Sequence, residues 1–249
     1  MALLEVEGLR SGYERLPVIF GIHLEVGEGE VVALLGLNGA GKTTTLRAIS
    51  GMIPVMGGRI RFDGNDIAGL PAEQIARRGL LHIPEGRGIF PSLRVDESLR
   101  LAAAMARVPA AEARSRFEER RAQEHAWAIL HFLGLKDRAG SLAADLPVGL
   151  QRRLELGRAL MSRPRLLLLD EPAAGLDNKE TADLAGLLLR IRERFAVTML
   201  LVDHDMALVM RVCDNIYVLD FGELLTNGTP ASIRQDPEVI RAYLGEGVA

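Results

Sequence analysis

Gly36-Leu37-Asn38-Gly39-Ala40-Gly41-Lys42-Thr43 is the stretch of sequence that decides the fold. It has the spacing G-x-x-x-x-G-K-[ST], follows the apolar run 31–35 and precedes a helix-forming segment over 43–50. Glycines let successive backbone N–H groups converge on phosphate oxygens without Cβ clashes, and the helix N-terminus adds positive potential. The stretch therefore predicts a loop that cradles nucleotide phosphates between a buried strand and a helix.

Three side chains of this stretch have the chemistry to act on the phosphates. Lys42 carries a positive charge for the terminal phosphates, and the Thr43 hydroxyl can join the coordination shell of Mg²⁺. Thr44 can add a further hydrogen bond to a phosphate. A dinucleotide-binding turn would need G-x-G-x-x-G and an acidic residue after the next strand, and this spacing is absent.

Two acidic residues supply a second half of the site. Asp170 and Glu171 follow the apolar run 166–169, and ligands of open parallel sheets bind at the carboxyl ends of strands. Asp170 is suited to hold Mg²⁺, mainly through water, and Glu171 to polarise the attacking water. The same pair could merely cap the next helix, but its combination with the cradle favours the catalytic interpretation.

His204 follows another apolar run, 198–202, and so is expected at the same edge of the sheet. Its imidazole can donate a hydrogen bond to the γ-phosphate or help to orient the water. A single histidine at a strand end is usually structural. We assign His204 a role in the site only because it is expected beside the cradle and the two acidic residues.

The remaining patterns indicate an α/β fold. Segments 4–7, 22–26 and 59–62 alternate apolar and polar residues, which predicts antiparallel strands with one solvated face, and Asp63-Gly64 supplies a turn. The apolar runs 31–35, 166–169 and 198–202 are typical of parallel strands covered by helices on both faces.

The middle of the chain is rich in helix-forming residues and poor in strand signals. We therefore expect one domain over 1–249: a nucleotide-binding α/β core with an antiparallel β subdomain, formed by 1–94 and 164–249, and an inserted helical subdomain, 95–163. The fold class is that of a P-loop NTPase with a RecA-like core.

Charge, cysteine content and the lengths of the apolar runs exclude or disfavour several classes of function. The net charge of -3 argues against a nucleic-acid partner, because there is no basic excess to neutralise phosphates. The single cysteine, Cys213, excludes an internal disulfide and is expected to be a small buried side chain. No apolar run approaches the roughly 20 residues that span a bilayer, so a membrane role would require a partner.

Together these residues resemble the ATP-binding cassette family over nearly the whole chain. The resemblance implies ATP and Mg²⁺ as ligands and a dimer in which each subunit covers the other's ATP. It implies that Tyr13 stacks on adenine and that His204 is the switch histidine. It also implies that the loop ending at Asp177 crosses the dimer interface.

Two family motifs are altered in this sequence. The signature motif, usually Leu-Ser-Gly-Gly-Gln, falls at Leu146-Pro147-Val148-Gly149-Leu150, so proline removes an N–H and a hydroxyl that could serve phosphate. Gly149 and the following helix N-terminus remain available to the partner's ATP. Glu85 stands where the family has a glutamine that meets Mg²⁺ and senses the membrane subunit, and its carboxylate can still approach the metal.

The subfamily resemblance is mixed. Residues 83–91 resemble one ATPase subunit of branched-chain amino-acid importers, whereas residues 146–157 and the tail from Asp203 to Glu246 resemble the other. This implies uptake of branched-chain or other hydrophobic amino acids through two transmembrane permease subunits. It also implies a second cassette subunit, as homo- or heterodimer, and indirectly a secreted solute-binding protein. The chain would lie peripherally on the cytoplasmic face of the inner membrane.

Other functions remain open at this point. A soluble or regulatory cassette ATPase not coupled to transport would fit the degenerate signature loop, and ATPase assays with and without a partner cassette would distinguish it. Cassettes of DNA repair or translation typically carry two cassettes or a long coiled-coil insertion. A P-loop kinase or GTPase would lack the signature segment and the Asp170-Glu171 pair followed by Ala174-Gly175-Leu176-Asp177.

Overall fold

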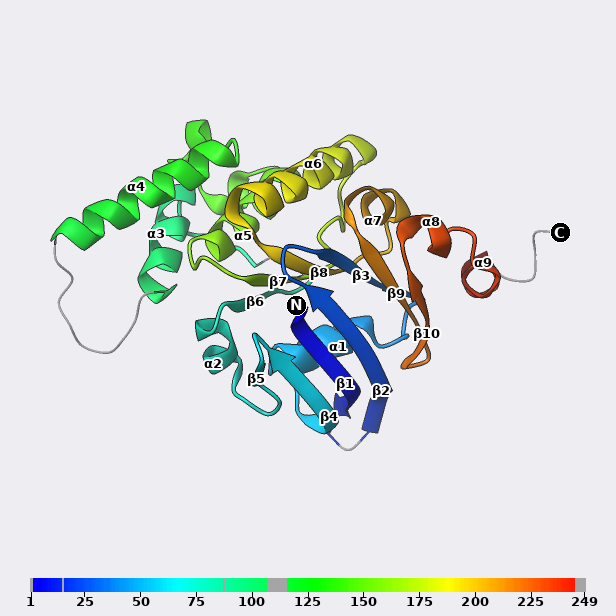
Figure 1. Cartoon of the computed structure of the whole chain (residues 1–249). Coiled ribbons are helices and arrows are strands. Elements are labelled where there is room, and N and C mark those ends of the chain that lie inside the picture. Colours follow the sequence, from blue (N-terminus) through cyan, green and yellow to red (C-terminus); the bar gives the residue numbers. More distant parts are fainter. Residues whose placement is uncertain (1, 15, 87, 107–115, 245–249) are drawn as a thin grey trace.

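The computed structural model describes residues 2–14, 16–86, 88–106 and 116–244. Arg87 and residues 245–246, which belong to the segments compared above, lie outside this description. Two sheets and the helices around them make up the described chain (Figure 1).

The central sheet has six strands, and its C-terminal strand ends carry the candidate site. In spatial order the strands are β10 (Glu223–Gly228), β9 (Asn215–Asp220), β3 (Val31–Gly36), β8 (Thr198–Val202), β7 (Leu166–Asp170) and β6 (Leu80–Ile83). All neighbours pair in parallel except β9 and β10. The three fully apolar runs therefore form adjacent parallel strands, as the sequence predicts.

Three strands of this sheet, β6, β9 and β10, were not anticipated from the sequence. β6 is a short edge strand, and β10 has no continuous apolar run. These two are the edge strands of the sheet, so their composition carries a weaker signal. β9 is an internal strand, and its buried apolar run 216–219 was passed over in the sequence.

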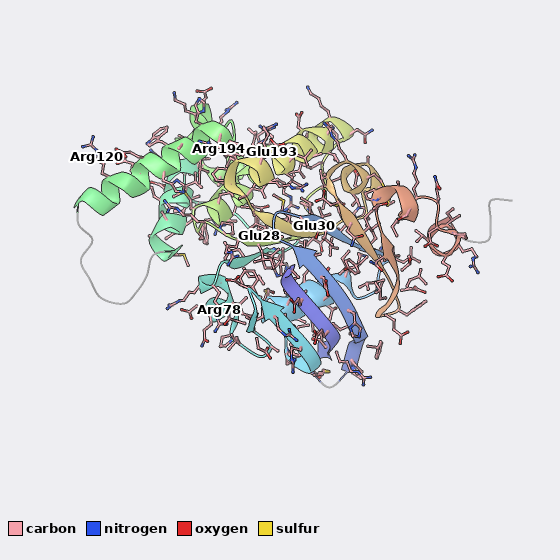
Figure 2. The ribbon with its side chains drawn as sticks, in the orientation of Figure 1. Glu28, Glu30, Arg78, Arg120, Glu193 and Arg194 are labelled. Atoms are coloured by element: carbon pink, nitrogen blue, oxygen red, sulfur yellow. The ribbon has the colours of Figure 1, made fainter. Side chains whose placement is uncertain are left out.

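The second sheet is antiparallel. Its order is β2 (Leu16–Gly27), β1 (Ala2–Tyr13), β4 (Val55–Phe62) and β5 (Asn65–Asp66). The alternating segments predicted from sequence lie inside β1, β2 and β4. Asp63 and Gly64 both have positive φ, 52° and 72°, and form the expected two-residue turn between Phe62 and Asn65. Glu28 and Glu30 mark the turn that leads from β2 into the central sheet (Figure 2).

Two hydrophobic cores lie on opposite faces of the central sheet. α1 (Lys42–Ile49) lies between the two sheets, where its apolar side chains pack with Val32 and Leu34 of β3. Ala33 and Leu35 point to the other face, into the core shared with α6 (Asn178–Phe195) and α7 (Met206–Val212). Alternation along a strand thus divides each apolar run between two cores. Cys213 is buried in the second core, as expected.

The helical run lies at one side of the central sheet (Figure 1). It contains α3 (Val95–Ala106), α4 (Arg116–Phe132) and α5 (Val148–Leu160), with the short 3-10 turns η1 (Lys136–Arg138) and η2 (Ala143–Asp145). α5 packs against α3 and α4 and also against β6 and α6, so it joins this run to the core. The remaining helices are α2 (Ala72–Arg77), α8 (Pro230–Ile233) and α9 (Pro237–Leu244). Among the described residues, no helix is both long and apolar enough to span a membrane.

Candidate functional site

The phosphate cradle is the turn from β3 into α1. Gly41 forms the helix N-cap with φ 96°, and a Cβ there would lie 2.7 Å from the Ile19 side chain. At Gly36 a Cβ would lie 2.6 Å from the Leu219 carbonyl oxygen. No side chain caps α1, so its first N–H groups remain free for a ligand. The turn therefore requires glycine and presents backbone donors of the kind that bind phosphate.

Lys42 lies inside the cradle and is nearly buried. Its ammonium Nζ donates hydrogen bonds to the carbonyl oxygens of Gly36, at 2.8 Å, and Leu37, at 3.1 Å. Burial lowers the pKa of Lys42, while the nearby carboxylates of Glu171 and Asp170 raise it. The loop thus holds the positive charge against its own backbone, within the turn that would receive the phosphates.

Thr43 and Asp170 are in direct contact. The Thr43 hydroxyl donates a hydrogen bond to Asp170 Oδ1 at 2.9 Å, across 127 residues of sequence. Asp170 is 2% exposed, and its Oδ2 has no hydrogen-bond partner among the described residues. Burial raises the pKa of Asp170, and the Thr43 hydrogen bond opposes this. The Thr43 hydroxyl and the buried Asp170 Oδ2, which has no partner among the described residues, are hard oxygen ligands of the type that Mg²⁺ prefers.

Glu171 and His204 face each other at the ends of β7 and β8. His204 Nδ1 lies 3.6 Å from Glu171 Oε2, and the His204 side chain is 67% exposed. Glu171 has a positive φ of 48°, which is uncommon for this residue type and is held by its N–H bond to the Val202 carbonyl, 2.7 Å. Burial raises the pKa of Glu171, and Glu85 raises it further. A raised pKa strengthens a carboxylate as a base towards water.

Asp203 is a residue of this site that the sequence reasoning missed. Its side chain is 1% exposed; Oδ2 accepts from the Ala173 N–H and Oδ1 from the Asp205 N–H, both at 2.9 Å. One carboxylate therefore ties the loop after Glu171 to the loop of His204. The available sequence signal was an acidic residue directly after a fully apolar run, the same signal that singled out Asp170.

Glu85 lies in the loop after β6, the strand next to β7. Its side chain is exposed, and its negative charge raises the pKa of both Asp170 and Glu171. Within the described residues, no three acidic, histidine or cysteine side chains are arranged to hold a metal ion unaided. A metal here would therefore depend on Thr43, water and the ligand's own oxygens for the rest of its shell.

Tyr13 lies at the end of β1 and is 41% exposed. Its hydroxyl accepts a hydrogen bond from Arg47 Nη1 of α1 at 3.0 Å, which ties the ring to the helix that follows the cradle. The ring is thus connected to the cradle through α1 and keeps an exposed surface.

The altered signature motif leads into α5. Pro147 is the N-cap of α5, where it provides no side-chain hydrogen bond, and Val148 is 43% exposed. A Cβ on Gly149 would lie 2.9 Å from Glu180 Oε1. Glu180 forms a capping box with Asp177, the N-cap of α6. Gly149 and Asp177 therefore lie close together, and neither is in contact with the cradle among the described hydrogen bonds.

The strand order explains which predicted residues meet. Strands β3, β8, β7 and β6 are consecutive neighbours in the sheet. The cradle begins at the end of β3, and His204 follows β8. Asp170 ends β7, Glu171 comes directly after it, and Glu85 follows β6. This arrangement of a glycine cradle, a lysine and strand-end carboxylates defines a P-loop NTPase.

Comparison with known proteins identifies the family. The model of the ABC transporter family matches residues 19–174, and that of the branched-chain amino acid ATP-binding cassette transporter matches residues 223–249. The chain belongs to the ATP-binding cassette transporter family, and it is an ATPase of that family.

Several relatives match over nearly their whole length. The high-affinity branched-chain amino acid transport ATP-binding protein BraF of Pseudomonas aeruginosa is 42% identical, with 98% of each chain covered. LivG of Salmonella typhimurium, of the same description, is 40% identical with the same coverage. The lipopolysaccharide export system ATP-binding protein LptB of Escherichia coli is 37% identical, covering 99% of this chain and 98% of LptB.

Solved structures confirm the fold. The ADP conformation of MJ1267, an ATP-binding cassette of an ABC transporter, has a TM-score of 0.85 and 25% identity, covering 99% of this chain and all of that one. CbiO1 from Clostridium perfringens, part of the transporter complex cbiONQ, has a TM-score of 0.83 and 26% identity, with 96% and 93% covered. The predicted α/β P-loop class, with its additional antiparallel sheet, is therefore confirmed.

Proposed function

We propose that this chain is the ATP-hydrolysing subunit of an importer for branched-chain or other hydrophobic amino acids. The observation that carries the ATPase site is the convergence of Lys42, the Thr43–Asp170 hydrogen bond and the Glu171–His204 contact at one edge of the sheet. The match at 223–249 and the descriptions of BraF and LivG support the substrate class. LptB, a similar cassette, is described as part of a lipopolysaccharide export system, so similarity of the cassette by itself does not determine the transported molecule.

The cradle is proposed to bind the ATP phosphates through its backbone. Its contributing residues are Gly36, Leu37, Asn38, Gly39, Ala40, Gly41, Lys42, Thr43 and Thr44. Free N–H groups at the start of α1 and the nearly buried Lys42 ammonium supply the positive potential. The exposed face of Tyr13 is proposed to stack on adenine.

Mg²⁺ fits the donors at the ends of β7 and α1. Thr43, Asp170 and, through its loop, Glu85 would hold it, because the Thr43 hydroxyl already contacts Asp170 and Asp170 Oδ2 lacks a partner among the described residues. When bound, the ion would supply charge that stabilises the phosphate oxygens.

Glu171 is proposed to orient the water that attacks the γ-phosphate in line. Its burial and raised pKa favour acceptance of a proton, and Asp203 holds its loop. Lys42 stabilises negative charge that spreads over the phosphoryl oxygens, and His204 can donate a hydrogen bond to the same group. The exposure of His204 leaves it accessible to that ligand.

A second cassette subunit is proposed to complete the site. Gly149 and the N-terminus of α5 would cap the ATP of the partner, and Asp177 would lie at the interface. Pro147 removes one backbone donor, so the cap depends on the N–H groups of Val148 and Gly149, which helical hydrogen bonding cannot satisfy. The proximity of Gly149 to the Asp177 capping box supports a single interface formed by both loops.

The permease subunits are proposed to dock between the core and the helical subdomain, which we assign to 95–163. A groove of about 380 Å³ lies there, lined by residues of β6, the following loop, α3 and α5, among them Pro84, Met105 and Arg158. Glu85 follows Pro84 directly, so a protein seated in this groove would contact the loop that carries Glu85. We also place the chain peripherally on the cytoplasmic face of the inner membrane, with a secreted solute-binding protein acting indirectly, and the descriptions of BraF and LivG as transport ATP-binding proteins support this.

Two variants test the proposed function. Glu171→Gln should bind MgATP with near-normal affinity and lose roughly 100-fold or more of the hydrolysis rate, because the base is removed while the cradle is retained. Lys42→Ala should instead lose nucleotide affinity. Nucleotide titration and phosphate release, measured on both variants, separate the two steps. Near-normal hydrolysis by Glu171→Gln would refute the catalytic assignment.

A further inference from the structure

Two charged residues of α5 hold the backbone of the loop that follows Glu85. Arg152 Nη1 and Glu155 Oε2 form an ion pair at 2.9 Å, with side chains 13% and 4% exposed. Glu155 Oε1 accepts the Gly88 N–H at 2.7 Å, and Arg152 Nη1 donates to the Gly86 carbonyl at 2.9 Å. The pair thus connects the helix that begins at the signature motif with Gly86 and Gly88, two backbone positions that follow Glu85.

A third residue of the same helix extends this contact. The Arg158 guanidinium lies over the ring of Phe90, 4.3 Å from its centroid. Arg152, Glu155 and Arg158 are spaced by three residues, so they lie along one side of α5. Gly86, Gly88 and Phe90 are therefore each in contact with a side chain of α5.

The ion pair also borders the metal-binding edge of the sheet. Arg152 and Glu155 share a small cavity with Asp170, which leaves about 10 Å³ for the centre of a water molecule. Arg152 Nε is buried and has no hydrogen-bond partner in the described parts of the chain. The pair therefore lies between the signature helix, the Glu85 loop and the Asp170 carboxylate.

Burial of this pair is poorly explained by stability alone. Taking two charges out of water carries a desolvation penalty that their attraction often fails to exceed, and apolar residues of similar size can stabilise a fold as well. By contrast, the two hydrogen bonds to Gly86 and Gly88 fix backbone positions that apolar side chains could not hold.

We propose that Arg152 and Glu155 are positioning residues for ATP hydrolysis, which set the place of Glu85 by holding Gly86 and Gly88 against the signature helix. This inference rests on the proposed function, because it assigns the pair to the same site. A change in the orientation of α5 would be transmitted through the pair to Glu85, beside Asp170 and Glu171. The signature motif of one subunit is thereby linked to that subunit's own carboxylates.

A double-mutant cycle on hydrolysis tests the proposal. The experiment compares kcat, MgATP affinity and thermal unfolding of full-length variants. The single variants are Glu155→Gln, Glu155→Ala and Glu85→Ala, and each Glu155 substitution is also combined with Glu85→Ala. Glu155→Gln retains an oxygen for the Gly88 N–H, so it serves if Glu155→Ala fails to fold. Arg153→Ala is the matched control, since Arg153 lies on the same helix but donates to the Leu133 carbonyl, 3.3 Å, away from the loop.

We expect Glu155→Ala to lower kcat roughly 10- to 100-fold, as loss of a supporting residue around a metal site does, with MgATP affinity retained. Glu155→Gln should lose less, and Arg153→Ala should keep the wild-type kcat. In the Glu85→Ala background, the Glu155 substitutions should reduce kcat no further, because they act through Glu85. A purely structural role would instead lower the unfolding temperature and leave the two effects on kcat multiplicative.

The positioning role would be overturned if the effects of the Glu155 and Glu85 substitutions on kcat were multiplicative, or if folded Glu155→Ala kept its kcat. In either case, turnover by the wild-type protein would still uphold the proposed function. A wild-type protein that binds MgATP without hydrolysing it would overturn both. The two failures are therefore distinguishable in one set of assays.

Discussion

The phosphate cradle and the signature loop are both turns that lead into the N-terminus of a helix, yet they offer a ligand very different donors. In the cradle the N-cap of α1 is Gly41, which has a positive φ, and the next residue is the nearly buried Lys42. The signature loop ends in Pro147, which has no N–H, and continues with the β-branched Val148. The comparison shows that two helix N-termini can present different donors to a phosphate, because the residues of the preceding turn add backbone N–H groups and charge or remove them.

The two regions also differ in what holds them. The cradle is shaped by its own backbone and by the Thr43–Asp170 contact. The signature loop is held by Gln151, whose Nε2 donates to the Leu146 carbonyl at 2.8 Å, and by the close approach of Gly149 to Glu180. The first region is therefore held by a residue of the candidate site itself, whereas the second is held by residues outside that site.

Among the changes that bear on this comparison, the largest effect is expected from loss of Asp203, the buried carboxylate that holds the loops of Glu171 and His204 beside the cradle. Asp203→Ala should lower kcat roughly 10- to 100-fold with little change in KM, because Glu171 and His204 lose the group that joins their loops. Steady-state kinetics measure the split between kcat and KM.

Asp214→Ala is the control for Asp203. Asp214 Oδ2 also accepts a backbone N–H, that of Val31 at 2.8 Å, but at the opposite end of β3. Its loss should reduce stability and leave kcat near the wild-type value. Equal losses of kcat in both variants would assign Asp203 a general structural role.

A smaller effect is expected when the signature loop is made more like the cradle. Pro147→Ser restores an N–H and a hydroxyl at the N-cap of α5, so we expect hydrolysis to rise about two- to tenfold, the scale of one added hydrogen bond. Pro147→Ala restores the N–H alone and separates the two contributions. Phosphate release under conditions that favour dimerisation measures the change, and a fall in activity would contradict the comparison.

The smallest effect on hydrolysis is expected at His82 of β6, where a substitution should change stability alone. Burial, aided by the nearby Arg47 charge, lowers the pKa of His82 in β6 to about 4, and His82 Nδ1 lies 3.0 Å from Ser50 Oγ. Between pH 6.5 and 4, His82 binds a proton in the unfolded chain but stays neutral in the folded chain. His82 thus destabilises the fold as pH falls through this window, by up to about 3 kcal/mol.

His82→Gln removes this titration while a side chain that can bond to Ser50 is kept. Denaturant unfolding of both proteins at several pH values should show a flatter decline for the variant between pH 6.5 and 4. Parallel curves would show that His82 is not the group responsible.

Much of the candidate site could be proposed from the sequence because its motifs are local. Gly36 to Thr43 is contiguous, and Asp170, Glu171 and His204 each follow a strongly apolar run that marks a buried strand. Asp203 also follows an apolar run, but its role depends on the Ala173 N–H, 30 residues away, and no local pattern reports such a partner. The interaction of Glu155 with Gly88 spans 67 residues and was missed for the same reason.

The sequence by itself determined the glycine turn, the apolar strands and the identity of the charged groups, because φ preferences and side-chain burial are properties of neighbouring residues. Only the tertiary structure decided that the strands carrying the cradle, His204, Asp170 and Glu85 are consecutive neighbours in one sheet. It also decided that α5 holds the loop after Glu85. Strand order and helix docking depend on contacts between distant segments, and these become defined only when the two cores pack.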